Sequence, residues 1–208
     1  MSAVPGEPIE RGTPTGGVRL AQRRRSQPVG WWGMALFLCT EATIFGTMIA
    51  TYFYLEFSNR YWPPPGIAPE KVTDPSIATG VLVATVVPMW LAARAARRGE
   101  RRTVLWMIAL AFAVQAAYFG VQVALMAHDL SNFSPKETAY GSIYYTLLGT
   151  HHAHVFVGCL LDLTVFWFVA RKGLTDYWLT GTRSLSLYWY VINGLAVLVL
   201  LTQLSPSL

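Results

Sequence analysis

Five long apolar stretches, separated by short polar segments, fill nearly all of the chain after Gly30. Their approximate bounds are Trp31–Phe57, Pro75–Ala96, Val104–Ala127, Tyr140–Ala170 and Leu185–Leu204. Each meets the length of roughly 20 residues that a membrane-spanning helix needs. Lipid offers no partner for bare backbone groups, and the strands of a barrel would be shorter and strictly alternating. The pattern therefore predicts an all-α integral membrane protein with five transmembrane helices.

The composition leaves no room for a soluble domain, because 53% of the 208 residues are hydrophobic and only 13% are charged. We divide the chain into a basic tail, residues 1–29, and a five-helix transmembrane domain, residues 30–208. The tail is polar and contains proline and glycine, so we expect a flexible cytoplasmic segment that only a partner would order. Cys39 and Cys159 both lie inside predicted helices. This placement argues against a disulfide framework and against a cysteine-rich metal site.

The net charge of +5 is distributed unevenly. Basic residues crowd the tail, the segment 94–102 and the segment 171–183, whereas the alternate loops carry only Arg60, Lys71 and Lys136. Positive residues mark the cytoplasmic side of a membrane protein. The distribution predicts a cytoplasmic N-terminus and a C-terminus on the outside, as five crossings require. Bases beside membrane helices usually contact lipid headgroups, so we expect no nucleic-acid partner.

The first stretch carries one carboxylate, Glu41, about 15 Å along the helix axis from Trp31 at the usual helical rise. That height is near the bilayer midplane, where an ionised acid costs several kcal/mol or more. We expect the group to be neutral unless water or a cation reaches it. Candidate partners nearby are Thr40, Thr43 and Thr47. Two interpretations stay open: a proton-access or partner-coupling role, and a hydrogen bond that only joins helices.

The fourth stretch holds a second polar cluster, made of His151, His152, His154 and Asp162. His151 and His154 are three residues apart and share a helical face, whereas His152 points away from it. Histidines of facing helices can ligate haem. The one other histidine, His128, is predicted at the outer end of the third helix. Haem or copper held by this chain alone is therefore disfavoured, and we expect hydrogen bonds between helices, with Glu41 as one candidate partner.

Several motifs resemble subunit III of the haem-copper respiratory oxidases, such as cytochrome c oxidase. The first helix matches that family's Gly-Met-x-Leu-Phe-x-x-x-Glu pattern from Gly33 to Glu41, and the next loop matches its Trp-Pro-Pro-x-Gly-Ile-x-Pro segment from Trp62 to Pro69. The stretch 140–158 resembles Gly-Ser-x-Phe-Phe followed by His-Gly-x-His-Val, and 188–193 resembles Tyr-Trp-His-Phe-Val-Asp. The motifs occur in the family's order between residues 30 and 204, and the helix count is that of the five-helix bacterial form.

Several positions depart from the family patterns, and one of them is the glycine between the two family histidines of the fourth helix, which is His152 here. The Gln-x-x-Glu-Tyr motif keeps its glutamine as Gln122 but has Leu125 in place of the acid. The last helix has Tyr190 and Asn193 where the family has histidine and aspartate. Glu41, His151 and His154 are the polar positions that match, and Gln122, Asp162 and Asn193 are candidate supporting residues.

The resemblance implies a non-catalytic subunit of a bacterial terminal oxidase in the cytoplasmic membrane. Such a subunit has no redox centre and no catalytic residue or metal ligand of its own, because haem and copper belong to subunit I. It packs mainly on subunit I, with subunit II and small subunits as further candidates, binds phospholipid, and supports proton uptake and stability during oxygen reduction. Cytochrome c is the favoured electron donor, with quinol left open. The alternative is an independent transporter or proton channel that uses Glu41 and the histidines, although no paired half-length helices or inverted repeat support it.

Overall fold

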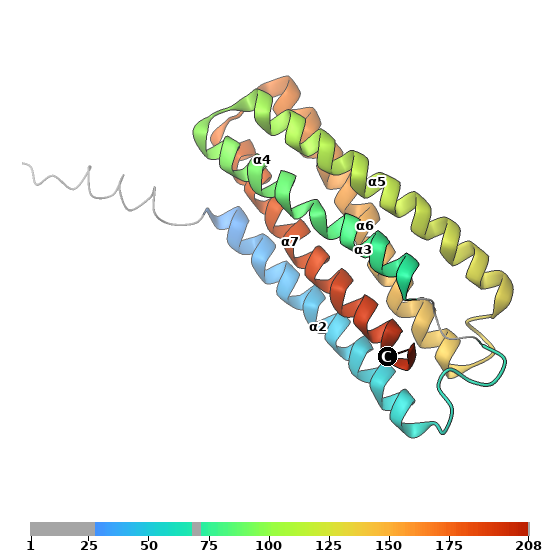
Figure 1. Ribbon diagram of the computed structural model, residues 1–208. Coiled ribbons are helices and arrows are strands. Elements are labelled where there is room, and N and C mark those ends of the chain that lie inside the picture. The colour runs from blue at the N-terminus through green and yellow to red at the C-terminus, as the bar shows by residue number, and fades with distance from the viewer. Residues whose placement is uncertain (1–27, 68–71, 208) are drawn as a thin grey trace, which may run out of the picture.

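The computed structural model describes residues 28–67 and 72–207, so most of the predicted tail lies outside the described residues. The helices are α2 (Val29–Ser58), α3 (Thr73–Ala84), α4 (Val86–Arg98), α5 (Arg101–Asn132), α6 (Ala139–Lys172) and α7 (Asp176–Leu204), followed by the short 3-10 helix η1 (Ser205–Ser207). Helices α3 and α4 together form one span, so that five apolar spans run along a common direction (Figure 1). This confirms the prediction of an all-α fold with five long apolar helices, and each predicted stretch lies inside one span.

The second span is interrupted at Thr85, which the sequence interpretation treated as part of one continuous helix. Pro88 has no N–H and cannot bond the carbonyl of Ala84, one turn earlier. The backbone N–H of Thr85 instead bonds to Leu82 O at 3.0 Å, and its hydroxyl donates to the same oxygen at 2.7 Å. The break therefore presents a buried hydroxyl to the neighbouring helices in the middle of the membrane domain.

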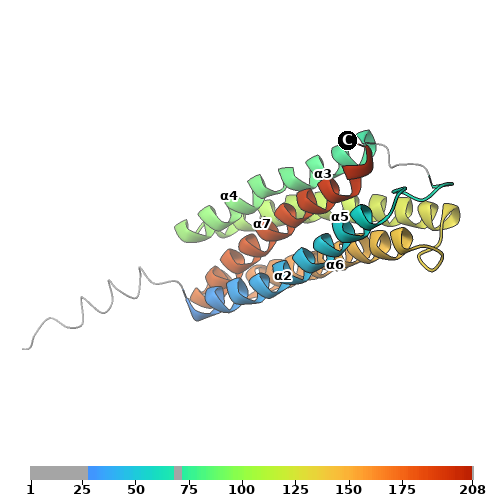
Figure 2. The same cartoon turned by 90° about the horizontal axis from the view of Figure 1, so that it is seen from below.

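Helix α7 lies at the centre of the bundle and is the most buried of the spans. It packs against α2, α3, α4 and α6, while α5 packs against α3, α4 and α6 on the other side (Figures 1 and 2). Helix α2 is the most exposed span and presents large apolar side chains outward, including Leu36, Phe37 and Ile44. Helices that are apolar all round suit a lipid environment.

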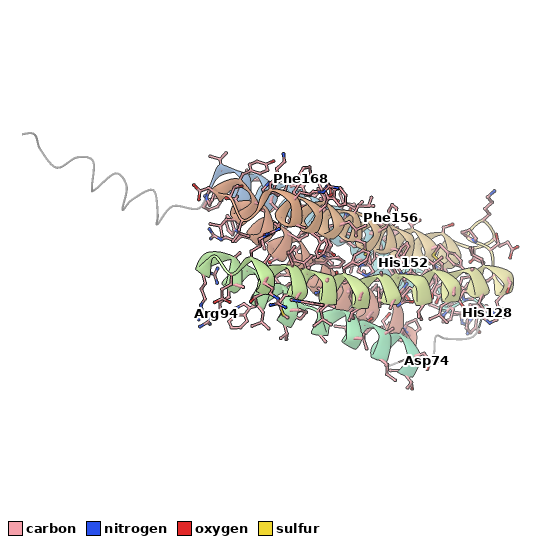
Figure 3. The ribbon with its side chains drawn as sticks, turned by 90° about the horizontal axis from the view of Figure 1, so that it is seen from above. Asp74, Arg94, His128, His152, Phe156 and Phe168 are labelled. Atoms are coloured by element: carbon pink, nitrogen blue, oxygen red, sulfur yellow. The ribbon has the colours of Figure 1, made fainter. Side chains whose placement is uncertain are left out.

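The two ends of the bundle differ in charge. The turns between α4 and α5 and between α6 and α7 lie at the same end as the start of α2 (Figure 1). Figure 3 shows Arg94 at this basic end and both Asp74 and His128 at the opposite end. We call the opposite end the acidic end, after Asp74 and Asp129. At the basic end, Arg101 donates from Nε to Val169 O at 3.0 Å and from Nη2 to Ala170 O at 2.5 Å. The guanidinium thus gives Ala170 O a partner near the end of α6 and shares Val169 O with the backbone N–H of Gly173, which bonds to it at 3.1 Å.

The loop after α2 is fixed by aromatic packing at the acidic end. The ring of Trp62 is partly buried and packs edge-on against Tyr52 and Tyr140, with centroid distances of 5.4 and 5.0 Å. Phe133 packs against Tyr140 and Tyr144 from the next loop. This aromatic cluster attaches the ends of α2, α5 and α6 to one another.

Candidate functional site

Glu41 of α2 pairs with His154 of α6 at the edge of the bundle. The distance from His154 Nε2 to Glu41 Oε2 is 3.0 Å, and His154 Nδ1 lies 2.8 Å from Thr150 O. A carbonyl oxygen only accepts, so Nδ1 carries a proton and Nε2 faces the acid. The pair is then either a neutral imidazole accepting from a carboxylic acid or an imidazolium donating to a carboxylate. One shared proton thus has two places to reside within a single hydrogen bond.

The threonines expected beside Glu41 do not bind it. Thr40 donates to Phe37 O at 2.6 Å, Thr43 to Cys39 O at 3.0 Å and Thr47 to Ile44 O at 2.8 Å. Hydroxyls inside a helix commonly bond back to their own backbone in this way. The polar partner of Glu41 therefore comes from a different helix.

His151 faces α5 rather than α2. Its Nε2 lies 3.5 Å from the hydroxyl of Tyr118, which in turn accepts from Gln122 Nε2 at 3.2 Å. The His151 side chain is 1% exposed, and its Nδ1 has no hydrogen-bond partner among the described residues. Although His151 and His154 share a broad helical face, a spacing of three residues separates them by about 60° around the axis. That angle directs the two imidazoles to different helices.

His152, which stands where the family has glycine, is buried between α5 and α6 (Figure 3). Its ring centroid lies 6.5 Å from the ring centroid of Phe119. Neither of its ring nitrogens has a partner in the part of the chain that the structure describes. The structure gives it no link to Glu41.

Asp162 is the centre of a second polar network and is fully buried. Its Oδ1 accepts from Trp189 Nε1 at 3.1 Å. The amide orientation that satisfies both ends of Gln115 places Nε2 2.7 Å from Asp162 Oδ2 and Oε1 3.3 Å from Thr85 Oγ1. Asn193 Nδ2 extends the chain to Thr85 Oγ1 at 3.4 Å. The network joins the break after α3 to α5, α6 and α7, where lipid could supply no partner.

Gly158 allows this network to form, because it lies against the indole of Trp189. A Cβ atom at Gly158 would be 2.6 Å from Trp189 Cζ2 and 3.0 Å from Tyr188 Cε1. The Tyr188 hydroxyl donates to His154 O at 2.7 Å, which ties α7 to α6 beside the Glu41 pair. Gly158 therefore serves packing between α6 and α7 within this chain.

Of the predicted site residues, the structure brings Glu41 and His154 together, links His151 to Gln122 through Tyr118, and places Asp162 and Asn193 in one network. Sequence reasoning missed Thr85, Gln115 and Trp189. Gln115 gave a usable signal, since it is one of two amides, with Gln122, inside an otherwise apolar stretch. Thr85 and Trp189 gave none, because both residue types are common in membrane helices.

The residues do not fit a haem or copper centre within this chain. His151, His152 and His154 all lie on α6, and His128 lies at the far end of α5 (Figure 3). Across residues 28–67 and 72–207, no three side chains of His, Cys, Asp or Glu form a group that could hold a metal ion.

Together, the five apolar spans and the hydrogen-bonded polar networks between them define a polytopic helical membrane protein with polar groups in its interior. The family model for cytochrome c oxidase subunit III matches residues 26–204, and the chain belongs to that family.

Individual relatives agree with this assignment. The chain is 28% identical to cytochrome c oxidase subunit 3 of Thermostichus vulcanus over 68% of this chain and 69% of the relative. It is 29% identical to the Coturnix japonica subunit over 67% of this chain and 58% of that protein. It is also 27% identical to the cytochrome bo(3) ubiquinol oxidase subunit 3 of Pseudomonas aeruginosa, over 70% of this chain and 68% of the relative.

Proposed function

We propose that this chain is a non-catalytic subunit III of a bacterial respiratory haem-copper oxidase of the cytochrome c oxidase type. It packs on subunit I and supports proton uptake and stability there, while oxygen is reduced at haem and copper in that partner. The observation that carries the proposal is the family match over residues 26–204. The donor set supports it, since the histidines of this chain do not face one another across the bundle as haem ligands would.

The Glu41–His154 pair is the group through which we propose the chain affects proton uptake. The two side chains keep relative exposures of 17% and 15%, so the pair lies at the edge of the bundle. Helix α2, which carries Glu41, is also the least covered span. A partner helix packed on α2 would reach the pair directly.

We further propose that the basic end faces the cytoplasm and that phospholipid covers the apolar outer surface. Interfacial pairs at this end support the orientation. Arg171 lies over the ring of Trp167 at 4.3 Å, and Arg94 over that of Trp90 at 5.2 Å. Tryptophan and arginine at one height are typical of the headgroup region.

Purification of a tagged chain from membranes in mild detergent tests the proposal. We expect a large haem-bearing partner to co-purify, with a reduced-minus-oxidised haem spectrum and oxygen consumption. Reduced cytochrome c and a quinol, supplied separately, identify the electron donor. A colourless oligomer of this chain alone would favour a transporter, and haem absorbance in the isolated chain would favour a self-contained haem protein; either result would overturn the proposal.

A further inference from the structure

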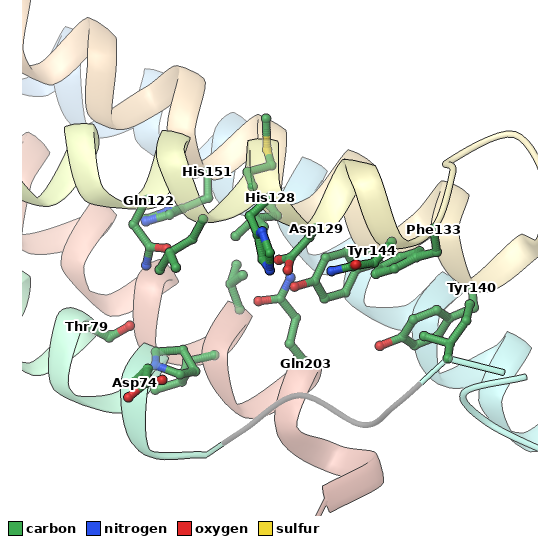
Figure 4. Close-up of a pocket in the computed structure, with 18 of the residues that line it drawn as sticks. Asp74, Thr79, Gln122, His128, Asp129, Phe133, Tyr140, Tyr144, His151 and Gln203 are labelled. Carbon is green, nitrogen blue, oxygen red and sulfur yellow. The ribbon is translucent and has the colours of Figure 1, made fainter.

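A cavity of about 580 Å³ opens at the acidic end of the bundle, and the linked residues His151, Tyr118 and Gln122 form part of its wall. Helices α3, α5, α6 and α7 each contribute to its wall (Figure 4). Its outer part is lined by Asp74, His128, Asp129 and Tyr140, and its inner part by Gln122 and His151. Tyr140 and His151 are eleven residues apart on α6, a distance of about 17 Å along the axis. Half of the hydrocarbon core is about 15 Å thick, so the cavity penetrates deep into the membrane domain.

Two buried side chains in this wall have polar atoms without a partner in the described segments. His151 is 1% exposed and its Nδ1 is unbonded, and Gln203 is 6% exposed and its Nε2 is unbonded. Figure 4 shows both groups at the cavity, Gln203 near Asp129 and His151 near Gln122. Buried polar atoms are almost always satisfied by protein or by ordered water. An apolar occupant would leave both atoms unsatisfied, which argues against a lipid tail in this space.

The charged groups of the wall favour a cationic content. Asp74 and Asp129 are carboxylates, and no lysine or arginine is among the described residues that line the cavity. An anionic phosphate headgroup would meet two carboxylates, with the imidazoles of His128 and His151 as the only bases among the described lining residues. Charge interactions at this place are stronger than in bulk water. A small cation or a protonated water cluster would instead be attracted by the two carboxylates.

We propose that this cavity is a water-filled inlet for small cations, protons included, which ends at His151. The volume holds on the order of ten or more water molecules. Water there gives His151 Nδ1 and Gln203 Nε2 their missing partners. His151 Nε2 lies 3.5 Å from the hydroxyl of Tyr118, which also lines the cavity, so the imidazole and this hydroxyl are the inner groups through which the inlet exchanges protons. The inlet is separate from the Glu41–His154 pair, which lies on the α2 side of α6.

Cysteine accessibility in native membranes tests the inlet. The thiolate is the reacting form of cysteine, so a thiol reacts quickly with a charged, membrane-impermeant reagent only where water reaches it. In a background with Cys39→Ala and Cys159→Ala, we compare Gln122→Cys, in the cavity wall, with Val121→Cys. Val121 is 54% exposed on the outside of α5 but does not line the cavity. We expect trimethylammonioethyl methanethiosulfonate to label Gln122→Cys at least about tenfold faster, the reverse of the order that surface exposure alone would give.

A second pair on α3 protects the test against a variant that fails to assemble. Thr79→Cys is a small change in the cavity wall, and Val81→Cys on the same helix is its lipid-facing control. Open membrane fragments are used, so the result does not depend on the orientation of the chain or on its role in an oxidase. Equal rates within both pairs would overturn the inlet.

The cation preference is tested by comparing the trimethylammonioethyl reagent with the anionic sulfonatoethyl reagent. Each rate is divided by that for Glu137→Cys, which lies in an exposed loop. We expect the ratio of cationic to anionic rate to be several times higher at Gln122→Cys and Thr79→Cys than at this reference. A cationic-to-anionic ratio at these two positions that is no higher than the ratio at Glu137→Cys would refute the cation preference.

Discussion

Substitution of Gly158 by alanine should damage the chain far more than one added methyl group suggests. The new Cβ atom would lie 2.6 Å from Cζ2 and 2.9 Å from Cη2 of Trp189. Carbon atoms in contact are normally about 3.5–4.0 Å apart, so the indole must move by about 1 Å. Trp189 is 0% exposed and Tyr188, the next neighbour of the methyl group, is 1% exposed. Neither ring has free space into which it could move.

The magnitude follows from two contributions. Overpacking of a filled interior costs about 1–3 kcal/mol. Displacement of the indole also lengthens the 3.1 Å hydrogen bond from Trp189 Nε1 to Asp162 Oδ1, and an unsatisfied buried group costs about 1–3 kcal/mol. The expected loss is therefore about 2–6 kcal/mol. This loss is the difference in free energy of unfolding between Gly158→Ala and the control Gly149→Ala. The control lies on the same helix, and a Cβ atom there meets nothing within 4 Å. Because both changes replace glycine by alanine in α6, the helix-propensity gain cancels in the difference.

Reversible unfolding in mixed micelles, followed by circular dichroism, measures the free energy of unfolding of both variants. A third protein, with Gly158→Ala and Trp189→Phe together, tests the cause, since a phenyl ring lacks the atoms that collide. We expect the added alanine to cost less beside the phenyl ring of this double variant than beside the native indole. Equal stability of the Gly158→Ala and Gly149→Ala proteins, within about 0.5 kcal/mol, would refute the close contact of α6 with α7.

Three further substitutions probe the remaining contacts. Glu41→Gln should leave assembly with the partner subunits intact but slow proton uptake or shorten the working life of the oxidase; unchanged stopped-flow proton uptake and inactivation rate would reduce Glu41 to a structural role. Arg101→Ala removes both bonds to the end of α6 and should lower the free energy of unfolding by about 0.5–1.5 kcal/mol, whereas its exposed neighbour Arg102→Ala should not. Thr138→Ala removes the N-cap of α6, whose hydroxyl accepts from the helix N–H at 3.0 Å, and should cost about 1 kcal/mol in thermal unfolding. Thr146→Ala, in which the lost hydroxyl only bonds back to its own helix, is the matched control.

The five spans could be predicted because the bilayer imposes a minimum apolar length that is visible in the sequence. Their ends were harder to predict. The last helix begins at Asp176, nine residues before the predicted Leu185, and its first turns are polar. Polarity does not end a helix outside the hydrocarbon region, and Thr175 caps this one by accepting from Trp178 N. The break at Thr85 depended on a single proline whose effect is local.

The partners of the polar residues were predictable only in part. The apolar surroundings of Glu41 and the α6 histidines already indicated that these groups need partners inside the bundle. Which histidine faces α2 depends on how α6 is rotated about its axis, and the structure selects His154. The Asp162 network depends on the relative heights of four helices. Those heights follow from side-chain packing, such as that of Trp189 on Gly158, and no periodicity in one helix specifies them.

Two of the polar systems of the bundle, the Asp162 network and the Glu41–His154 pair, differ in what can reach them, and this difference separates their roles. Asp162 and Gln115 are 0% exposed and are satisfied by other helices of the same chain, so a change there is felt first by the fold. Glu41 and His154 keep side-chain exposures of 17% and 15% beside the least covered helix. Their hydrogen bond offers a proton two positions, and a neighbouring subunit can shift the balance between them by contact or by charge. Loss of the Asp162 carboxylate should therefore lower the stability of the isolated chain, whereas loss of the Glu41 carboxylate should be detected only in the assembled complex.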